Sequence, residues 1–199
     1  GGLPVSAIAR WSGGAWSALG SGLAAPGSSP IAFSITPMSD GDLFVGGQFE
    51  SAGDSNASNI ARWSDDKRPA AGWSALATGF NGAWIDTLTI LSNGDVLAGG
   101  DFSSAGDGMN RRLARWSGSS WGAFASEENQ LQPGGFVEEI VERDDGAILI
   151  GGAFLLPGDE NFDSIALWNG TAWDDLGAEC DGYVRAMAFR PDGTMLVGG

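Results

Sequence analysis

One short pattern occurs four times in the sequence, and this repetition limits the folds that the chain can adopt. In each copy an apolar run ends in a pair of glycines, and a further Gly pair opens the chain in the same phase. Successive pairs lie about 50 residues apart. A fixed period of this length is typical of proteins that stack one small structural unit repeatedly. The four copies lie at residues 43–47, 96–100, 148–152 and 195–199.

Each repeat has the same internal order of short segments. A Phe and a polar loop follow the Gly pair, and then a short apolar segment ends in a Trp, which a turn separates from a second Trp. A further segment leads to Asp-Gly or Asn-Gly, the strongest short signal for a β-hairpin. This order predicts four short strands per repeat and no helix. The Trp pairs are Trp11 and Trp16, Trp63 and Trp73, Trp116 and Trp121, and Trp168 and Trp173.

The repeat predicts an all-β fold, a β-propeller of four-stranded blades. Residues 1–199 would form one propeller domain or propeller segment, with repeats at approximately 1–45, 46–98, 99–150 and 151–199. The first residues precede the third strand of a blade, and the last residues end a second strand. The two strands at the start of the chain and the two strands at its end could together complete one blade, which would close a small ring. Alternatively the chain is part of a larger propeller, or it completes a ring with another copy, since propellers have 4–8 blades.

The repeat resembles the kelch repeat, in which a Gly pair is followed by two aromatic residues at this spacing. The segment Ile-Ala-Arg-Trp-Ser-Gly at residues 8–13 is also similar to propeller repeats of secreted bacterial proteins and of Rax2-like fungal cell-surface proteins. The resemblance implies the fold and a secreted location, but propellers carry many unrelated functions. The copper site of the kelch-like galactose oxidases uses His and Tyr ligands. This chain has no His and one Tyr, Tyr183, so that site cannot be transferred.

Composition argues against several classes of function. The formal net charge of −15 would repel nucleic-acid phosphates, so we expect no nucleic-acid partner. No apolar run has the length of a membrane span. The chain lacks His, the commonest general base, and shows no nucleophile–base pair. We therefore expect a non-enzymatic protein without a required cofactor.

One loop has the composition of a calcium site. Asp159, Asn161 and Asp163 place oxygen ligands at alternate positions, as calcium-binding loops do. The same residue types also cap turns by bonding to their own backbone, and this structural role is the commoner one. Calcium is therefore the single cofactor that the sequence suggests, as an option.

Three further residues are candidates for contact with a ligand or partner. Trp84 lies outside the repeat pattern, whereas Asp54 and Asp107 recur in the loops after the Gly pairs. The regularly spaced Trp pairs could stack on sugar rings, but their spacing favours packing between blades.

An acidic cluster lies on the first strand of a blade and its turn. If that strand alternates, Glu138 and Glu142 share one face and Glu139 lies on the other. We interpret the cluster, which also includes Asp144 and Asp145, as a solvated or partner-facing edge. A carboxylate-based hydrolase or lyase is a third and weaker alternative.

These observations favour a structural or protein-interaction module of an extracellular or cell-surface assembly. Its partners would be other protein subunits or a second copy of itself. The alternative is a carbohydrate-binding, lectin-like propeller, assisted by calcium if the acidic loop holds it.

Overall fold

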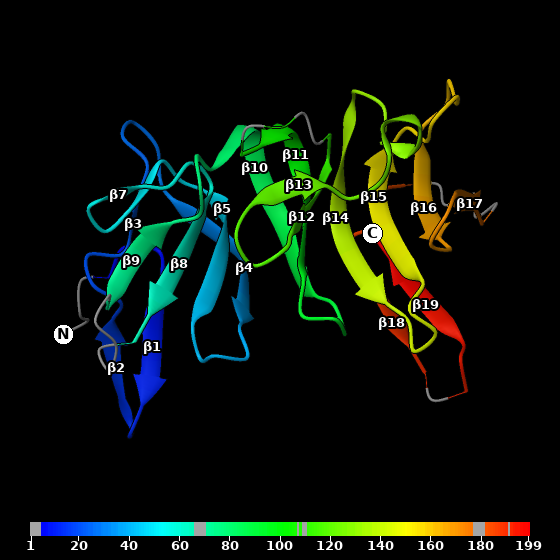
Figure 1. Cartoon of the computed structure of the whole chain (residues 1–199). Helices are drawn as coiled ribbons and strands as arrows, with labels where there is room; N and C mark the ends of the chain where they lie inside the picture. Colours follow the sequence, from blue (N-terminus) through cyan, green and yellow to red (C-terminus); the bar gives the residue numbers. More distant parts are fainter. Residues whose placement is uncertain (1–4, 66–70, 107, 109–110, 177–181, 191) are drawn as a thin grey trace.

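The computed structural model describes residues 5–65, 71–106, 108, 111–176, 182–190 and 192–199 (Figure 1). In this part of the chain the regular secondary structure is β-strand, apart from one turn of 3-10 helix at Glu127–Asn129. No helix in the described ranges is long and apolar enough to cross a membrane. The all-β prediction is confirmed.

Three antiparallel four-stranded sheets form the body of the protein. In each sheet the strands follow one another in chain order, joined by hairpins or short loops. Sheet 1 contains β4 (Ile31–Pro37), β5 (Leu43–Gln48), β8 (Ile60–Ser64) and β9 (Gly72–Ala75). Sheet 2 contains β10 (Phe80–Ile90), β11 (Val96–Ala105), β12 (Leu113–Trp116) and β13 (Trp121–Ala123). Sheet 3 contains β14 (Gly135–Glu142), β15 (Ile148–Phe154), β16 (Asp163–Trp168) and β17 (Trp173–Asp175).

A two-stranded hairpin lies at each end of this row. The N-terminal hairpin, β1 (Ala9–Ser12) and β2 (Ala15–Ala18), carries a Trp pair and corresponds to the third and fourth strands of a sheet. The C-terminal hairpin, β18 (Ala186–Phe189) and β19 (Met195–Gly198), corresponds to the first and second strands. The described chain therefore has three complete four-stranded sheets, and each end hairpin corresponds to one half of such a sheet.

A small additional sheet lies in a region where the sequence indicated only a polar loop. It joins β3 (Leu23–Ala24), β6 (Ser51–Ala52) and β7 (Ser55–Asn56). Because β3 follows the N-terminal hairpin and β6 follows β5, this sheet connects the hairpin to sheet 1.

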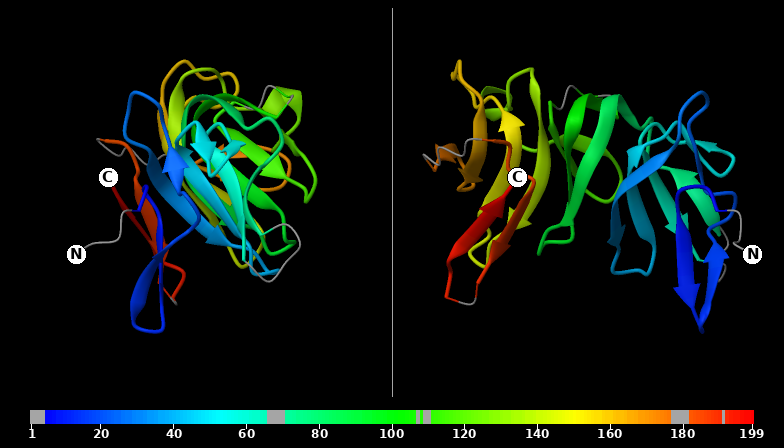
Figure 2. Two further views of the ribbon diagram at one scale, coloured as in Figure 1. Left: turned by 90° about the vertical axis from the view of Figure 1, so that its left-hand side faces the viewer. Right: turned by 180° about the vertical axis from the view of Figure 1, so that it is seen from behind.

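The sheets stand side by side in a row, with their first strands next to one another. Strand β10 contacts β4 on one side and β14 on the other, and β14 contacts β18. Figure 2 shows that both end hairpins project to the same side of the row, the side on which the first strands lie. The row is therefore bowed toward its first strands.

The hydrophobic core lies between the sheets. Phe44 and Ile60 of sheet 1 pack against Ile85, Leu88 and the Trp pair of sheet 2. The rings of Phe44 and Trp116 meet edge to face, with 6.1 Å between centroids. Sheets 2 and 3 form an equivalent core. The Trp pairs inside the row thus pack between sheets, as the sequence predicted.

The Gly pairs allow the close approach that this packing needs. The first glycine of a pair faces the next sheet: a Cβ on Gly99 would lie 2.8 Å from Val137 Cγ1. The second glycine faces its own first strand, and a Cβ on Gly100 would lie 2.4 Å from the Trp84 carbonyl oxygen. Gly46 and Gly151 face the next sheet in the same way. Side chains at these positions would push neighbouring sheets apart.

We predict that Gly99→Ala lowers the free energy of unfolding by about 1–3 kcal/mol, because the methyl group overpacks the junction of sheets 2 and 3. The matched control is Gly122→Ala on β13, where an added Cβ meets no atom within 4 Å. Urea unfolding of both variants measures the difference. Equal stability of the two variants would show that the junction tolerates a side chain.

Candidate functional site

Each first strand carries a β-bulge at the same place. The pairing register with the second strand skips one residue between Ala32 and Ser34, between Ile85 and Thr87, and between Val137 and Glu139. The extra residues are Phe33, Asp86 and Glu138, and Arg185 occupies the corresponding position just before β18. A bulge re-aims a side chain and is common beside functional sites. We call Trp84, Asp86, Asp101, Glu138 and Arg185 the inner-strand cluster.

Asp86 is the most perturbed carboxyl group of this cluster. Burial raises its pKa from 3.8 to about 7, and the negative charges of Glu138 and Asp101 act in the same direction. A hydrogen bond from the Trp84 side chain and the charge of Arg185 oppose this rise. The Oδ2 atom of Asp86 is buried without a hydrogen-bond partner among the described residues. Asp86 therefore exchanges a proton close to neutral pH.

Two arginines neutralise the other carboxylates of the cluster. Arg185 Nε lies 3.6 Å from Glu138 Oε2, and Arg112 Nη2 lies 3.5 Å from Asp101 Oδ1. Arg112 also donates hydrogen bonds to the carbonyl oxygens of Phe102 and Gly134, which ties sheet 2 to the segment before β14. In the described ranges no group of three or more His, Cys, Asp or Glu side chains could hold a metal ion.

The sequence predicted that side chains along the acidic strand alternate between two faces, and the bulge in β14 interrupts this alternation. Val137 and Ile140 are both buried although they lie three residues apart. Glu142 accepts hydrogen bonds from the backbone N–H and the hydroxyl of Ser92 in the turn of sheet 2. Glu138 and Glu142 thus have separate partners, and both link neighbouring elements instead of forming one solvated edge.

The predicted contact residues fall in different places. Trp84 belongs to the inner-strand cluster and is half-buried. Asp54 lies in the exposed turn between β6 and β7, outside the cluster. Asp107 lies outside the described residues. Sequence reasoning missed Asp86 because the bulge that buries its carboxyl group depends on the pairing of β10 with β11.

The predicted calcium loop connects β15 to β16. Asp159 and Asn161 are exposed, and Asp163 is the first residue of β16. Burial and the charges of Asp175 and Asp159 raise the pKa of Asp163, while a backbone hydrogen bond from Leu156 opposes the rise. Its Oδ2 atom is buried without a hydrogen-bond partner in the described part of the chain. Calcium binding by this loop remains a prediction.

Apolar side chains are exposed at the two ends of the row, although their counterparts in other repeats are buried. Trp11 is 56% exposed, whereas its counterpart Trp116 is 8% exposed. Leu176 is 40% exposed, whereas its counterpart Leu19 is 2% exposed. Contiguous exposed apolar surface often marks a protein-interaction site.

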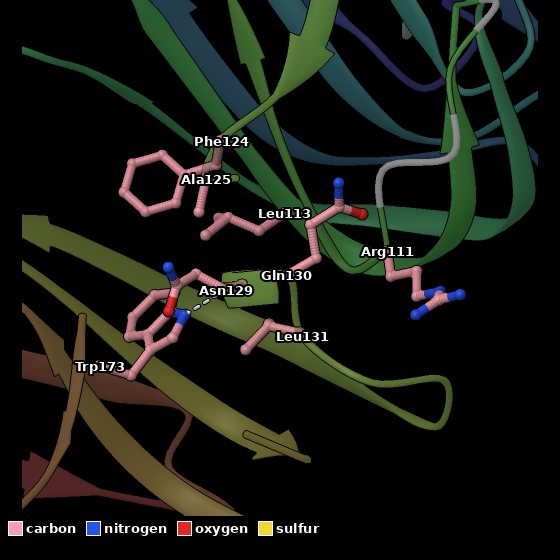
Figure 3. A pocket seen from close by; sticks show the side chains of 8 residues that line it. All are labelled: Arg111, Leu113, Phe124, Ala125, Asn129, Gln130, Leu131 and Trp173. Carbon is pink, nitrogen blue, oxygen red and sulfur yellow. Dashed lines mark hydrogen bonds between the residues drawn. The ribbon is translucent and has the colours of Figure 1, made fainter. Parts of the chain in front are cut away.

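The junction between sheets 2 and 3 shows how such apolar side chains pack inside the row. The ring centroids of Phe124, the residue after β13, and Trp173 of sheet 3 lie 5.9 Å apart, and Trp173 Nε1–H donates to the Asn129 carbonyl oxygen at 2.8 Å (Figure 3). The cavity that remains there has a volume of about 10 Å³. The groove beside the C-terminal hairpin, lined by Leu149, Leu176 and Met195 among others, has about 560 Å³. The ends are therefore open versions of the internal junctions.

Comparison with known proteins supports a propeller repeat. The family model described as a domain of unknown function (DUF5122) beta-propeller matches residues 39–62. This segment runs from the hairpin turn of sheet 1 through β5 and into β8. No curated protein and no solved structure matches the chain.

We predict that Asp86 makes the protein less stable as pH rises toward neutrality. Between the ordinary pKa of 3.8 and the folded value of about 7, the folded chain retains a proton that the unfolded chain has lost, so the free energy of unfolding falls across this window. Asp86→Asn should remove this contribution. The melting temperature of Asp86→Asn minus that of wild type should be larger near pH 8 than near pH 5.

The control for this experiment is Asp54→Asn, which changes an exposed carboxylate. Its melting temperature should follow that of wild type at both pH values. If the difference between Asp86→Asn and wild type did not change with pH, Asp86 would not titrate in this range.

Proposed function

We propose that this chain is a non-enzymatic, kelch-like or Rax2-like β-propeller module that binds another protein in an extracellular or cell-surface assembly. Sheets 1 to 3 are the blades, and the match to a propeller family supports this assignment. The observation that carries the proposal is the set of large apolar side chains that the described chain exposes, among them Trp11, Trp16 and Phe162.

The chemistry of the chain is better suited to binding than to catalysis. It contains no His, the commonest general base. The perturbed carboxyl group of Asp86 lies near the Trp84 side chain and the charged groups of Glu138, Asp101 and Arg185.

To test the proposal, purified chain would be photo-crosslinked to surface and secreted proteins of the source organism. We expect that Trp11→Asp with Trp16→Asp abolishes the crosslinked products, because two charges replace the apolar surface. The control is Ser28→Asp with Ser29→Asp, which adds the same charge in an exposed turn. Equal crosslinking by both variants, to other proteins and to itself, would contradict the proposal.

Glycan binding is a second candidate, favoured by the position of Trp84 beside Asp86. An aromatic ring next to a carboxyl group can hold a sugar by stacking and hydrogen bonding. If this is correct, Trp84→Ala should lose binding to a glycan array and Trp16→Ala should retain it. Addition of a chelator would show whether the loop of Asp159, Asn161 and Asp163 assists through calcium. Absence of binding by wild type would exclude this candidate.

A further inference from the structure

We propose that a groove at the junction of sheets 1 and 2 binds a guanidinium group, the group that an arginine side chain carries. At the junction of sheets 2 and 3 the corresponding place is taken by the side chain of Arg112. The inference goes beyond the proposed function and does not depend on it, because the groove is formed by other residues and its ligand is a small cation.

The Arg112 side chain is packed into the junction of sheets 2 and 3. It is 13% exposed, and each of its nitrogen atoms has a different partner. Nη1 donates to the Phe102 carbonyl oxygen at 2.6 Å, and Nε donates to the Gly134 carbonyl oxygen at 3.2 Å. Nη2 lies 3.5 Å from Asp101 Oδ1. The backbone of this junction therefore forms a site for a planar group with several N–H donors.

The junction of sheets 1 and 2 has the same backbone around an asparagine. Asn59 has the place of Arg112 in the repeat, and both residues have a left-handed backbone, with φ of 72° and 63°. The N–H of Asn59 donates to the Phe49 carbonyl oxygen, as that of Arg112 does to the Phe102 carbonyl oxygen. The shorter Asn59 side chain stays with its own sheet, where its Oδ1 accepts a hydrogen bond from the Phe49 N–H at 3.1 Å. The two junctions thus differ in the side chain at this position.

A groove of about 250 Å³ lies beside Asn59. It is lined by the end of β5 and the residues after it, by the segment before β8 and by the start of β10. The counterparts of these elements hold the partners of Arg112 at the next junction. One water molecule takes up roughly 30 Å³ in the liquid, so the groove has room for a guanidinium. Its lining includes Gln48, Phe49, Glu50, Asn59, Asn81 and Gly82.

Side-chain oxygen atoms are available in this groove for a cationic donor. Gln48 holds the place of Asp101 in the repeat, and Glu50 supplies a carboxylate where sheet 2 has Ser103. Glu50 is exposed, so a ligand can reach it from solvent. The salt bridges of the described arginines are formed with other carboxylates.

Charge and shape favour a guanidinium over other small ligands. The formal net charge of −15 attracts cations to the surface of the chain. A lysine ammonium is a compact and strongly hydrated point charge, whereas a guanidinium presents its donors in a fixed plane. The acceptors at the next junction come from two neighbouring sheets and surround such a plane. We therefore expect the groove to prefer arginine to lysine.

The experiment is a titration of the isotope-labelled chain, followed through its backbone amide NMR resonances. N-acetyl-L-arginine methylamide should shift the resonances of Phe49, Glu50 and Asn81. The capped lysine and the uncharged capped citrulline should need a concentration at least about tenfold higher for the same shift, because they lack the planar cation. Free L-arginine should act as the capped arginine does, since the guanidinium is the recognised group.

Two variants locate the site. Asn59→Arg should abolish the shifts, because its own guanidinium would take the groove as Arg112 does at the next junction. Glu50→Gln keeps the size of the side chain and should weaken binding about twofold to fivefold, the range for an exposed ion pair. The matched control is Glu160→Gln in the exposed loop between β15 and β16, which should leave binding unchanged.

Other outcomes overturn the inference. Absence of shifts in wild type would show that the groove binds no guanidinium, and equal shifts from the citrulline probe would show that the charge is not recognised. Shifts from free L-arginine alone would assign the binding to its amino and carboxylate groups. Equal weakening in Glu50→Gln and Glu160→Gln would place the binding elsewhere, even if Asn59→Arg did not fold. None of these results decides the crosslinking that tests the proposed function.

Discussion

The structure depends on one repeated contact, in which the first strand and the Trp pair of a sheet pack on the sheet before it. The contact needs a glycine where the strands approach most closely. Gly99 provides this space for Val137 and Ile140, and Gly46 provides it for Ile85 and Leu88. A four-stranded sheet has two faces to bury and cannot bury both alone, so each sheet is stabilised by its neighbours. The apolar core is accordingly distributed over the junctions.

The properties of the two ends follow from this contact. An end is a junction with one side missing, so the residues that make the contact elsewhere are exposed there. Trp11 and Trp16 still form an aromatic pair, with 5.3 Å between ring centroids, and both are exposed. This exposed aromatic surface is the physical basis for the proposed function.

The sequence was sufficient to predict the strands and the contacts that recur. The Gly pairs, Trp pairs and Asp-Gly turns predicted four short strands per repeat, as in β4, β5, β8 and β9, because each signal constrains the backbone locally. The bulges at Asp86 and Glu138 could not be predicted in this way, since they depend on how two strands pair. Simple alternation was therefore expected for Glu138, and Asp86 was not singled out.

The residues of the candidate site also differ in whether the local sequence was sufficient to identify them. Trp84 was identified because it departs from the repeat, but its neighbour Asp86 became visible only when burial and the charge of Glu138 were known. The small sheet of β3, β6 and β7 was missed because its strands have two residues each. The exposed ends required the complete packing, since Trp11 and Trp116 have similar sequence surroundings and opposite burial.

The most direct test of this account is hydrogen exchange of the backbone amides of β11 and β14, the two strands that meet at Gly99, in wild type and in Gly99→Ala. The account predicts that the variant loses protection in these two strands while β4 and β5 of sheet 1 retain theirs. Unchanged protection of β11 and β14 in the variant would contradict a contact that depends on the glycine.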